Sequence, residues 1–165
     1  MTLPHKISTL LYCFNDADEV LLMKRRQEPN SGLWSPAGGK LRMDVGESPY
    51  ACGCREAWEE MGLRLGPAEL RLTGIVSERS YLGQAHWLMF LFEVKLRLAQ
   101  VPPPHREGDF AFFKREDLGT LDLPQTDRDY IWPAFWEHRG GFFAAHCHCH
   151  PGGKDVWIVE ESRRA

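Results

Sequence analysis

Two apolar runs rich in strand-forming residues, 7–14 and 20–25, lie near the N-terminus and are separated by the polar segment 15–19. That segment has the composition of a turn, so we expect a hairpin or two neighbouring strands. Similar runs predict further strands, with a closing hairpin at the end of the chain: 70–80, 86–98, 110–113, 142–148 and 156–160.

The segment between the second and third runs predicts a helix with marked ends. Ser48 can cap its first turn, Pro49 occupies a position where a missing N–H costs nothing, and Gly62 can end it. At about 100° per residue, one stripe of this helix is suited to burial, and it consists of Tyr50, Cys54, Ala57 and Met61.

A second helix is predicted late in the chain, over residues 126–138. Thr126 or Asp127 would cap its start, and Pro133 predicts a kink or a late start. Strands on both sides of the first helix, with the second helix late, predict a mixed sheet between helices. We therefore expect an α/β fold with residues 1–165 as one domain, since no repeat, linker or low-complexity segment interrupts them.

The composition is that of a globular protein, with 43% hydrophobic and 26% charged residues. A net charge of −3 provides no general attraction to nucleic acid or to an anionic membrane. No apolar run is long enough to span a bilayer, and the N-terminus lacks the order of a signal peptide. Five cysteines without an export signal predict reduced thiols in a cytoplasmic protein. We expect a monomer or a homodimer.

Three carboxylates gather on one face of the first helix. Glu56, Glu59 and Glu60 lie at spacings i, i+3 and i+4, where like charges repel. A hard divalent cation turns that repulsion into attraction, and an all-oxygen cluster suits Mg²⁺ or Mn²⁺. An exposed acidic helix face is the alternative interpretation.

The stretch from Gly39 to Leu63 resembles the signature sequence of the Nudix hydrolase family. From Glu47 onwards it matches without a break, through Arg-Glu at 55–56 and Glu-Glu at 59–60. Only its front differs, because seven residues separate Gly39 from Glu47, two more than the family spacing. The resemblance implies the Nudix fold, an α/β/α sandwich with a mixed β-sheet.

The resemblance also implies a chemistry, the hydrolysis of a nucleoside diphosphate linked to another group by attack of water on phosphorus. It assigns metal binding to Glu56, Glu59 and Glu60, with Glu56 or Glu60 activating the water. Arg55 and Glu47 would form a salt bridge that orients the carboxylates.

Further site residues are implied outside the helix. Gly39 would offer its main-chain carbonyl to the metal, and Glu107 would be another ligand unless it is an ordinary surface charge. Lys24 or Arg25, at the end of the second strand-like run, would meet a substrate phosphate unless that strand end is merely solvated. Lys40, next to the glycines, is a further candidate for substrate binding.

A weaker likeness covers nearly the whole chain and concerns the oxidised-purine nucleoside triphosphatases, the 8-oxo-dGTP sanitising branch of the family. In that branch two adjacent acids before the second helix and an Asn in the lead-in strand contact the purine. Here Asp127 matches one acid, Arg128 stands in the place of the other, and Ser35 stands in the place of the Asn. A helix cap is the alternative role of Asp127.

These resemblances imply an enzyme that converts a (d)NTP or an oxidised purine (d)NTP to the monophosphate and pyrophosphate with Mg²⁺ or Mn²⁺. Its partner would be a small nucleotide, not a nucleic acid or a membrane. The alternatives are a hydrolase of a dinucleoside polyphosphate or a nucleotide sugar, and a non-catalytic nucleotide-sensing module. Sensing modules of this fold usually lose carboxylates of the signature, and all of them are present here.

Two other patterns invite a functional interpretation. Residues 146–150 alternate His and Cys, but alternation in a strand places the two residue types on opposite faces, unlike a Cys₂His₂ zinc site. Most of the tryptophans are expected in the core, with one or two lining a pocket. The long segment 40–46 is expected to set substrate access without carrying chemistry.

Overall fold

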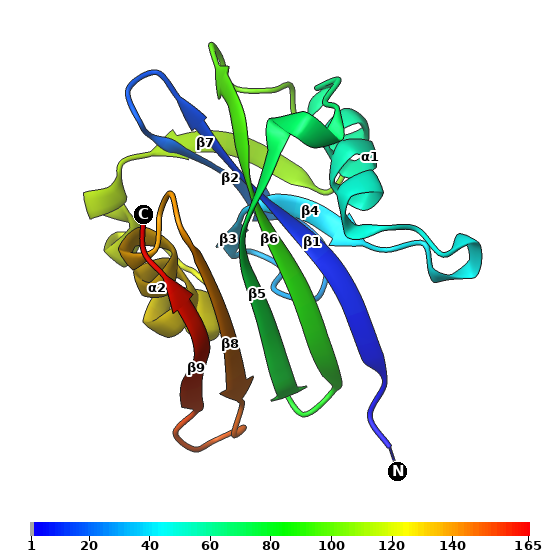
Figure 1. Ribbon diagram of the computed structural model, residues 1–165, viewed down its shortest axis with the longest axis vertical. Coiled ribbons are helices and arrows are strands. Elements are labelled where there is room, and N and C mark those ends of the chain that lie inside the picture. Colours follow the sequence, from blue (N-terminus) through cyan, green and yellow to red (C-terminus); the bar gives the residue numbers. More distant parts are fainter. Residues whose placement is uncertain (1) are drawn as a thin grey trace.

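The first strand lies in the interior of the sheet in the computed structural model, which describes residues 2–165 (Figure 1). Strand β1 (His5–Asn15) turns into β2 (Val20–Arg25), with Phe14 opposite Val20 in an antiparallel pair. The predicted hairpin is therefore confirmed. On its other side β1 runs parallel to β6 (Ala85–Leu98), and it also pairs with the short β4 (Ala37–Lys40).

The nine strands form one mixed sheet in the order β3-β2-β1-β6-β5-β8-β9, with β4 beside β1 and β7 beside β2. Two pairs are parallel, β1 with β6 and β5 with β8, and the closing hairpin of β8 and β9 is antiparallel. The remaining strands are β3 (Trp34–Ser35), β5 (Leu70–Tyr81), β7 (Gly108–Phe113), β8 (Phe142–His148) and β9 (Val156–Arg163). Short 3₁₀ turns are Met43–Val45, Pro67–Glu69 and Arg115–Thr120.

The sheet is covered on both faces, because successive side chains of a strand point to opposite sides. Tyr12 and Phe14 of β1 pack with Phe135 in one buried cluster. Leu11 and Cys13 pack with Ala57 and Met61 of the first helix in the other cluster. Figure 1 shows α1 (Pro49–Met61) and α2 (Trp132–Glu137) on opposite sides of the sheet. The expected α/β/α sandwich is confirmed.

Helix α1 begins and ends where the sequence predicts. The Ser48 hydroxyl accepts a hydrogen bond from the Ala51 N–H at 3.1 Å, and Gly62 ends the helix with a left-handed φ of 68°.

The predicted burial stripe of α1 is correct only in part. Tyr50 is 36% exposed and Cys54 half-buried, whereas Cys52 is fully buried. Gly53 explains the rotation, because a Cβ there would lie 2.9 Å from Leu70 Cδ1. Its missing side chain lets β5 approach this side of the helix.

The second helix begins with a π-turn, Asp127–Ile131, followed by α2. The predicted cap is wrong for both candidates, since neither side chain bonds to the first turn. The chain is already helical at Thr126, whose hydroxyl donates to Glu78 at 2.7 Å instead. Pro133 has no N–H to continue a regular α-helical ladder from the preceding turn, which accounts for the late start of α2.

No helix within residues 2–165 is long and apolar enough to cross a membrane.

Candidate active site

One cavity of about 460 Å³ lies between α1 and the start of the second helix. Its α1 wall is made by Gly39 and Lys40 of β4 with Arg55 and Glu56 of α1. Its β5 wall carries, among others, Glu78, Tyr81, Trp87, Thr126 and Asp127. Because β4 and β6 flank β1 on opposite sides, the sheet itself brings these two walls together.

Arg55 organises the carboxylates of the α1 wall. Its Nε and Nη2 bind both oxygens of Glu47 at 2.7 and 2.9 Å, so the predicted salt bridge is confirmed. Its Nη1 reaches Glu56 at 2.7 Å and Glu59 at 3.1 Å. The hydrogen bonds from Arg55 lower the pKa of Glu47 to about 2, so that pair stays charged. This anchored guanidinium holds Glu56 in a fixed orientation.

Glu60 carries a buried oxygen that has no protein partner. Its Oε2 accepts the Gly38 N–H at 2.9 Å, but no residue in the described part of the chain hydrogen-bonds to Oε1. Burial, followed by the neighbouring Glu107 and Glu56, raises the pKa of Glu60 to about 9. An unpaired buried carboxylate oxygen is costly, and a cation is the partner that this acidic surrounding favours.

Gly39 lets the main chain approach the same carboxylates. A Cβ at this position would lie 2.2 Å from Glu56 Oε1, so a side chain cannot fit without displacing the acid. Glu56, Glu60, Glu107 and the Gly39 carbonyl offer only oxygen atoms, the ligand type that Mg²⁺ and Mn²⁺ prefer.

Glu59 lies at the exposed edge of this group, with 42% of its side chain accessible. It bonds to Arg55 and also to Arg42 Nη2 at 3.1 Å. Glu107 comes from the segment before β7 and lines the cavity. Burial is the main reason that the pKa of Glu56 is raised, and the charges of Glu59 and Glu107 add to it. Of the predicted acids, Glu56 and Glu107 thus line the cavity, whereas Glu60 is buried beside them and Glu59 lies at the exposed edge.

The comparisons with known proteins identify the family. The model of the NUDIX domain matches residues 4–133, which include the whole α1 wall. The chain belongs to the Nudix family. It is a pyrophosphohydrolase, as the complete set of carboxylates predicts.

Three solved structures illustrate the likeness of this Nudix protein. The mutator MutT protein from Bacillus halodurans has 23% identity, a TM-score of 0.74, and coverage of 94% of this chain and 97% of its own. The MutT protein from Methanosarcina mazei Go1 has 26% identity, a TM-score of 0.69, and coverage of 82% and 95%. The Nudix domain of Shewanella oneidensis NrtR, crystallised with ADP-ribose, shares the fold at 17% identity, with a TM-score of 0.61 and coverage of 81% and 86%.

Of the residues predicted to bind phosphate, some line the cavity of the Nudix chain and one does not. Arg25 and Lys40 line the cavity, and Arg25 Nε is held by the Pro29 carbonyl at 2.9 Å. Lys24 is exposed and is not part of the cavity lining. The two neighbours point to opposite faces of β2, so only one of them can face the site. Ser35 is buried and lines the cavity as well.

Glu78 is a cavity residue that the sequence interpretation missed. It is only 4% exposed and lies in β5 two residues after the buried Val76. The sequence did carry a signal, because Glu78 is a charged residue that lies two positions from a core residue of the same strand and so points to the same side. A charged side chain on that side must either be paired or belong to a binding site. Trp87 is the tryptophan that lines the cavity.

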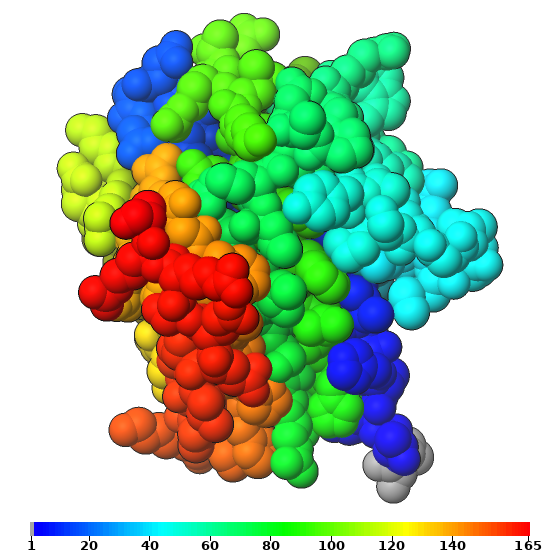
Figure 2. All heavy atoms as spheres, in the orientation of Figure 1, coloured from blue at the N-terminus to red at the C-terminus, as the bar shows by residue number. Residues whose placement is uncertain are grey.

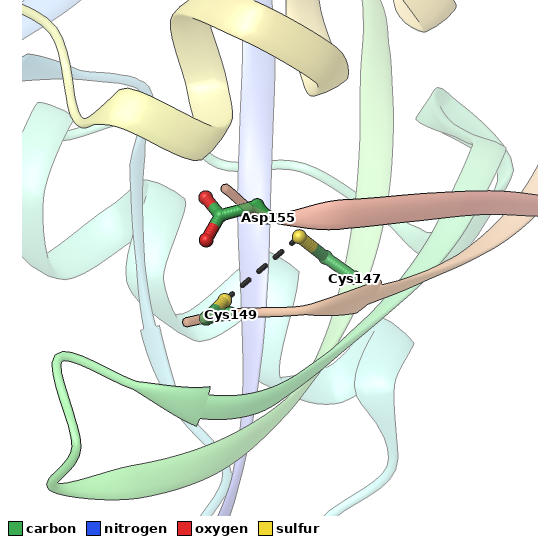
Figure 3. Close-up of side chains that lie close together, drawn as sticks. All are labelled: Cys147, Cys149 and Asp155. Carbon is green, nitrogen blue, oxygen red and sulfur yellow. Dashed lines mark hydrogen bonds between the residues drawn. The ribbon is translucent and has the colours of Figure 1, made fainter. Parts of the chain in front are cut away.

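The His/Cys strand of the Nudix chain alternates as predicted, with Cys147 and Cys149 buried. Their sulfur atoms lie 3.8 Å apart next to the carboxylate of Asp155 (Figure 3). His146 points to the other face, where Nδ1 lies 2.7 Å from Ser77 Oγ. Burial raises the pKa of Cys147 to about 11, so its thiol is neutral within this apolar cluster.

The segment 40–46 projects beside α1 and forms the cyan protrusion of Figure 2. Arg42 ties it to the site, because its N–H donates to Glu47 Oε2 at 2.9 Å and its side chain contacts Glu59. Beyond Arg42 the segment is open to solvent, with Met43 65% and Val45 69% exposed.

If the exposed tip sets substrate access, deleting Met43 and Asp44 is expected to change KM more than kcat, since Arg42 stays in place. Steady-state kinetics with a hydrolysed nucleotide tests this. Equal losses in kcat and kcat/KM with an unchanged KM would instead show that the tip helps to form the transition-state site.

Proposed function

We propose that this Nudix enzyme hydrolyses (d)NTPs, including oxidised purine (d)NTPs, to the monophosphate and pyrophosphate with Mg²⁺. The observation that carries the proposal is that one cavity joins the acidic α1 wall to a wall of buried polar groups and Trp87. Its volume of about 460 Å³ lies within the range of small-molecule sites. A nucleotide whose phosphate chain is bound at the α1 wall would place its base at the β5 wall.

Glu56, Glu59, Glu60, Glu107 and the Gly39 carbonyl would hold the metal. When bound, Mg²⁺ neutralises charge on phosphate oxygens and makes water easier to deprotonate. Arg25 and Lys40, which line the cavity, are placed to neutralise the remaining phosphate charge.

Glu56 is the residue to which we assign the proton of the attacking water. It lines the cavity, whereas Glu60 does not, and Arg55 fixes its orientation. The water oxygen bonds to phosphorus, its proton passes to the Glu56 carboxylate, and the bridging P–O bond breaks. The leaving pyrophosphate takes that electron pair, as an in-line displacement requires.

The test is a nucleotide panel in which released pyrophosphate and phosphate are measured with and without Mg²⁺. We expect pyrophosphate from purine (d)NTPs and no turnover after chelation. Preferential hydrolysis of ADP-ribose, a nucleotide sugar or a dinucleoside polyphosphate would replace the proposed substrate by one of these rivals. Tight binding without turnover of any compound would identify a sensing module.

Asp127 is proposed to contact the base, since its carboxyl lines the cavity and caps no helix. Asp127→Asn exchanges an acceptor oxygen for a donor. We expect the ratio of kcat/KM for purine over pyrimidine triphosphates to change tenfold or more, about 1.4 kcal/mol. Asp129→Asn is the matched control, because Asp129 is exposed on the same helical segment. A ratio that stays constant across the four common and the 8-oxo nucleotides would remove Asp127 from the base site.

A further inference from the structure

Two buried carboxyl groups face the cavity from different elements, and neither has a cationic partner. Asp127 is 8% exposed and Glu78 is 4% exposed, and both line the cavity. Glu78 accepts one hydrogen bond, from Thr126, while no side-chain hydrogen bond of Asp127 occurs within residues 2–165. Neither acid forms an ion pair with any described residue. Buried carboxyls that remain unpaired in a cavity are available to a ligand.

The two acids face the same space, because both line the cavity and Thr126, the residue before Asp127, donates a hydrogen bond to Glu78 at 2.7 Å. Burial and then the charge of Glu78 raise the pKa of Asp127 to about 8. Burial is also the main reason that the pKa of Glu78 rises to about 7. Near neutral pH the pair therefore keeps at least one proton.

The remaining hydrogen-bonding capacity of the pair defines a complementary ligand. One oxygen of Glu78 is already occupied by Thr126, which leaves one oxygen of Glu78 and two of Asp127. With one proton on either acid, these oxygens provide one donor and two acceptors. A ligand edge that matches them carries two N–H donors and one acceptor.

We propose that Glu78 and Asp127 together bind the amino-bearing edge of a purine base, with Glu78 as a specificity-determining residue. Guanine presents a ring N–H, an exocyclic amino group and a carbonyl, and adenine presents two amino hydrogens next to a ring nitrogen. Hypoxanthine and unsubstituted purine lack the amino group and leave an acceptor unpaired. This inference rests on the proposed function and specifies which bases its site prefers.

The side chains around the two acids suit the binding of a flat heterocycle. Trp87 and Met89 of β6 line the cavity near the acids, and they offer an aromatic and a thioether surface. The Tyr81 hydroxyl is held by Asn30 Oδ1 at 2.6 Å, so this side chain is fixed at the same wall.

The test is binding of product nucleotides to the full chain by calorimetry without metal, so that it does not depend on turnover. GMP and IMP differ only in the exocyclic amino group, as do AMP and purine riboside monophosphate. In the wild type we expect the amino-bearing member of at least one pair to bind tenfold or more tightly. In Glu78→Met that ratio should fall to about twofold or less.

Two further variants separate recognition from folding. Glu78→Gln keeps the shape of the side chain and provides a neutral donor and acceptor. The logarithm of its affinity ratio between the two members of a pair should therefore be at least half of the wild-type value. Glu160→Gln removes an exposed carboxyl on β9 outside the cavity and should leave the ratio unchanged. Circular dichroism verifies the fold of each variant.

Several results would overturn the inference. These are equal affinities within both pairs in the wild type, no detectable binding of any of the four nucleotides, or an unchanged ratio in folded Glu78→Met. If the enzyme still releases pyrophosphate from (d)NTPs, the proposed function stands and only the amino-group recognition fails. If no (d)NTP is hydrolysed in the panel, the proposed function itself is wrong.

Discussion

Glu56→Gln is expected to lower kcat about a thousandfold at saturating Mg²⁺, while the protein keeps its fold. Glu56 lines the cavity, touches the Gly39 main chain, and is the residue assigned to accept the proton of water. Gln keeps the volume and can still accept the hydrogen bond from Arg55 Nη1, which is 2.7 Å in the wild type. It cannot accept a proton at neutral pH or contribute negative charge to the donor set.

A thousandfold loss corresponds to about 4 kcal/mol of lost transition-state stabilisation. Pyrophosphate release at several Mg²⁺ concentrations measures it, and the Mg²⁺ concentration for half-maximal activity should rise as well. Glu160→Gln, which removes an exposed carboxyl far from this donor set, should behave like the wild type. Turnover within tenfold of the wild type for folded Glu56→Gln would refute the assignment.

The free energy of unfolding of the metal-free protein is expected to fall as the pH rises from about 4.5 to about 8. Glu78 releases its proton at about 4.5 when unfolded, but burial raises its pKa in the folded protein to about 7. Asp127 behaves in the same way, from 3.8 to about 8. Between these values the folded state binds more protons than the unfolded state, so stability decreases with pH and levels off above the folded pKa.

For Glu78 alone the loss amounts to roughly 3 kcal/mol, the equivalent of a shift from 4.5 to about 7. Denaturant titrations with EDTA at pH 5 and pH 8 measure it. Because other buried acids such as Glu60 titrate in the same range, the informative quantity is the difference between the wild type and Glu78→Gln. Gln cannot ionise, so its loss should be smaller, and an equal loss in both proteins would contradict the buried, protonated state of Glu78.

Local features of this protein follow from its sequence alone. The cap, first Pro and terminal Gly predict both ends of α1, because each acts within one turn of backbone. The spacing of Glu56, Glu59 and Glu60 predicts their common direction for the same reason. Apolar runs predict β1, β2, β5, β6 and the closing hairpin of β8 and β9. They do so because a strand that is buried on one or both faces has apolar residues at alternating or at successive positions.

Contacts between distant segments were decided by the tertiary structure. The sequence predicted a Thr126 or Asp127 cap, but the hydroxyl of Thr126 bonds to Glu78 on β5 and the Asp127 carboxyl lines the cavity. The side of β2 that faces the cavity was likewise undetermined, and it admits Arg25 but not Lys24.

The physical reason is that local periodicity determines which faces are apolar but not which strands become neighbours. The parallel pairing of β1 with β6 and of β5 with β8 places Glu78 and Trp87 beside the start of the second helix. Such pairings join segments far apart in sequence, and the packing of the whole sheet selects them. The sequence by itself therefore determined the grouping of the α1 carboxylates, and only the fold determined which polar groups line the cavity opposite them.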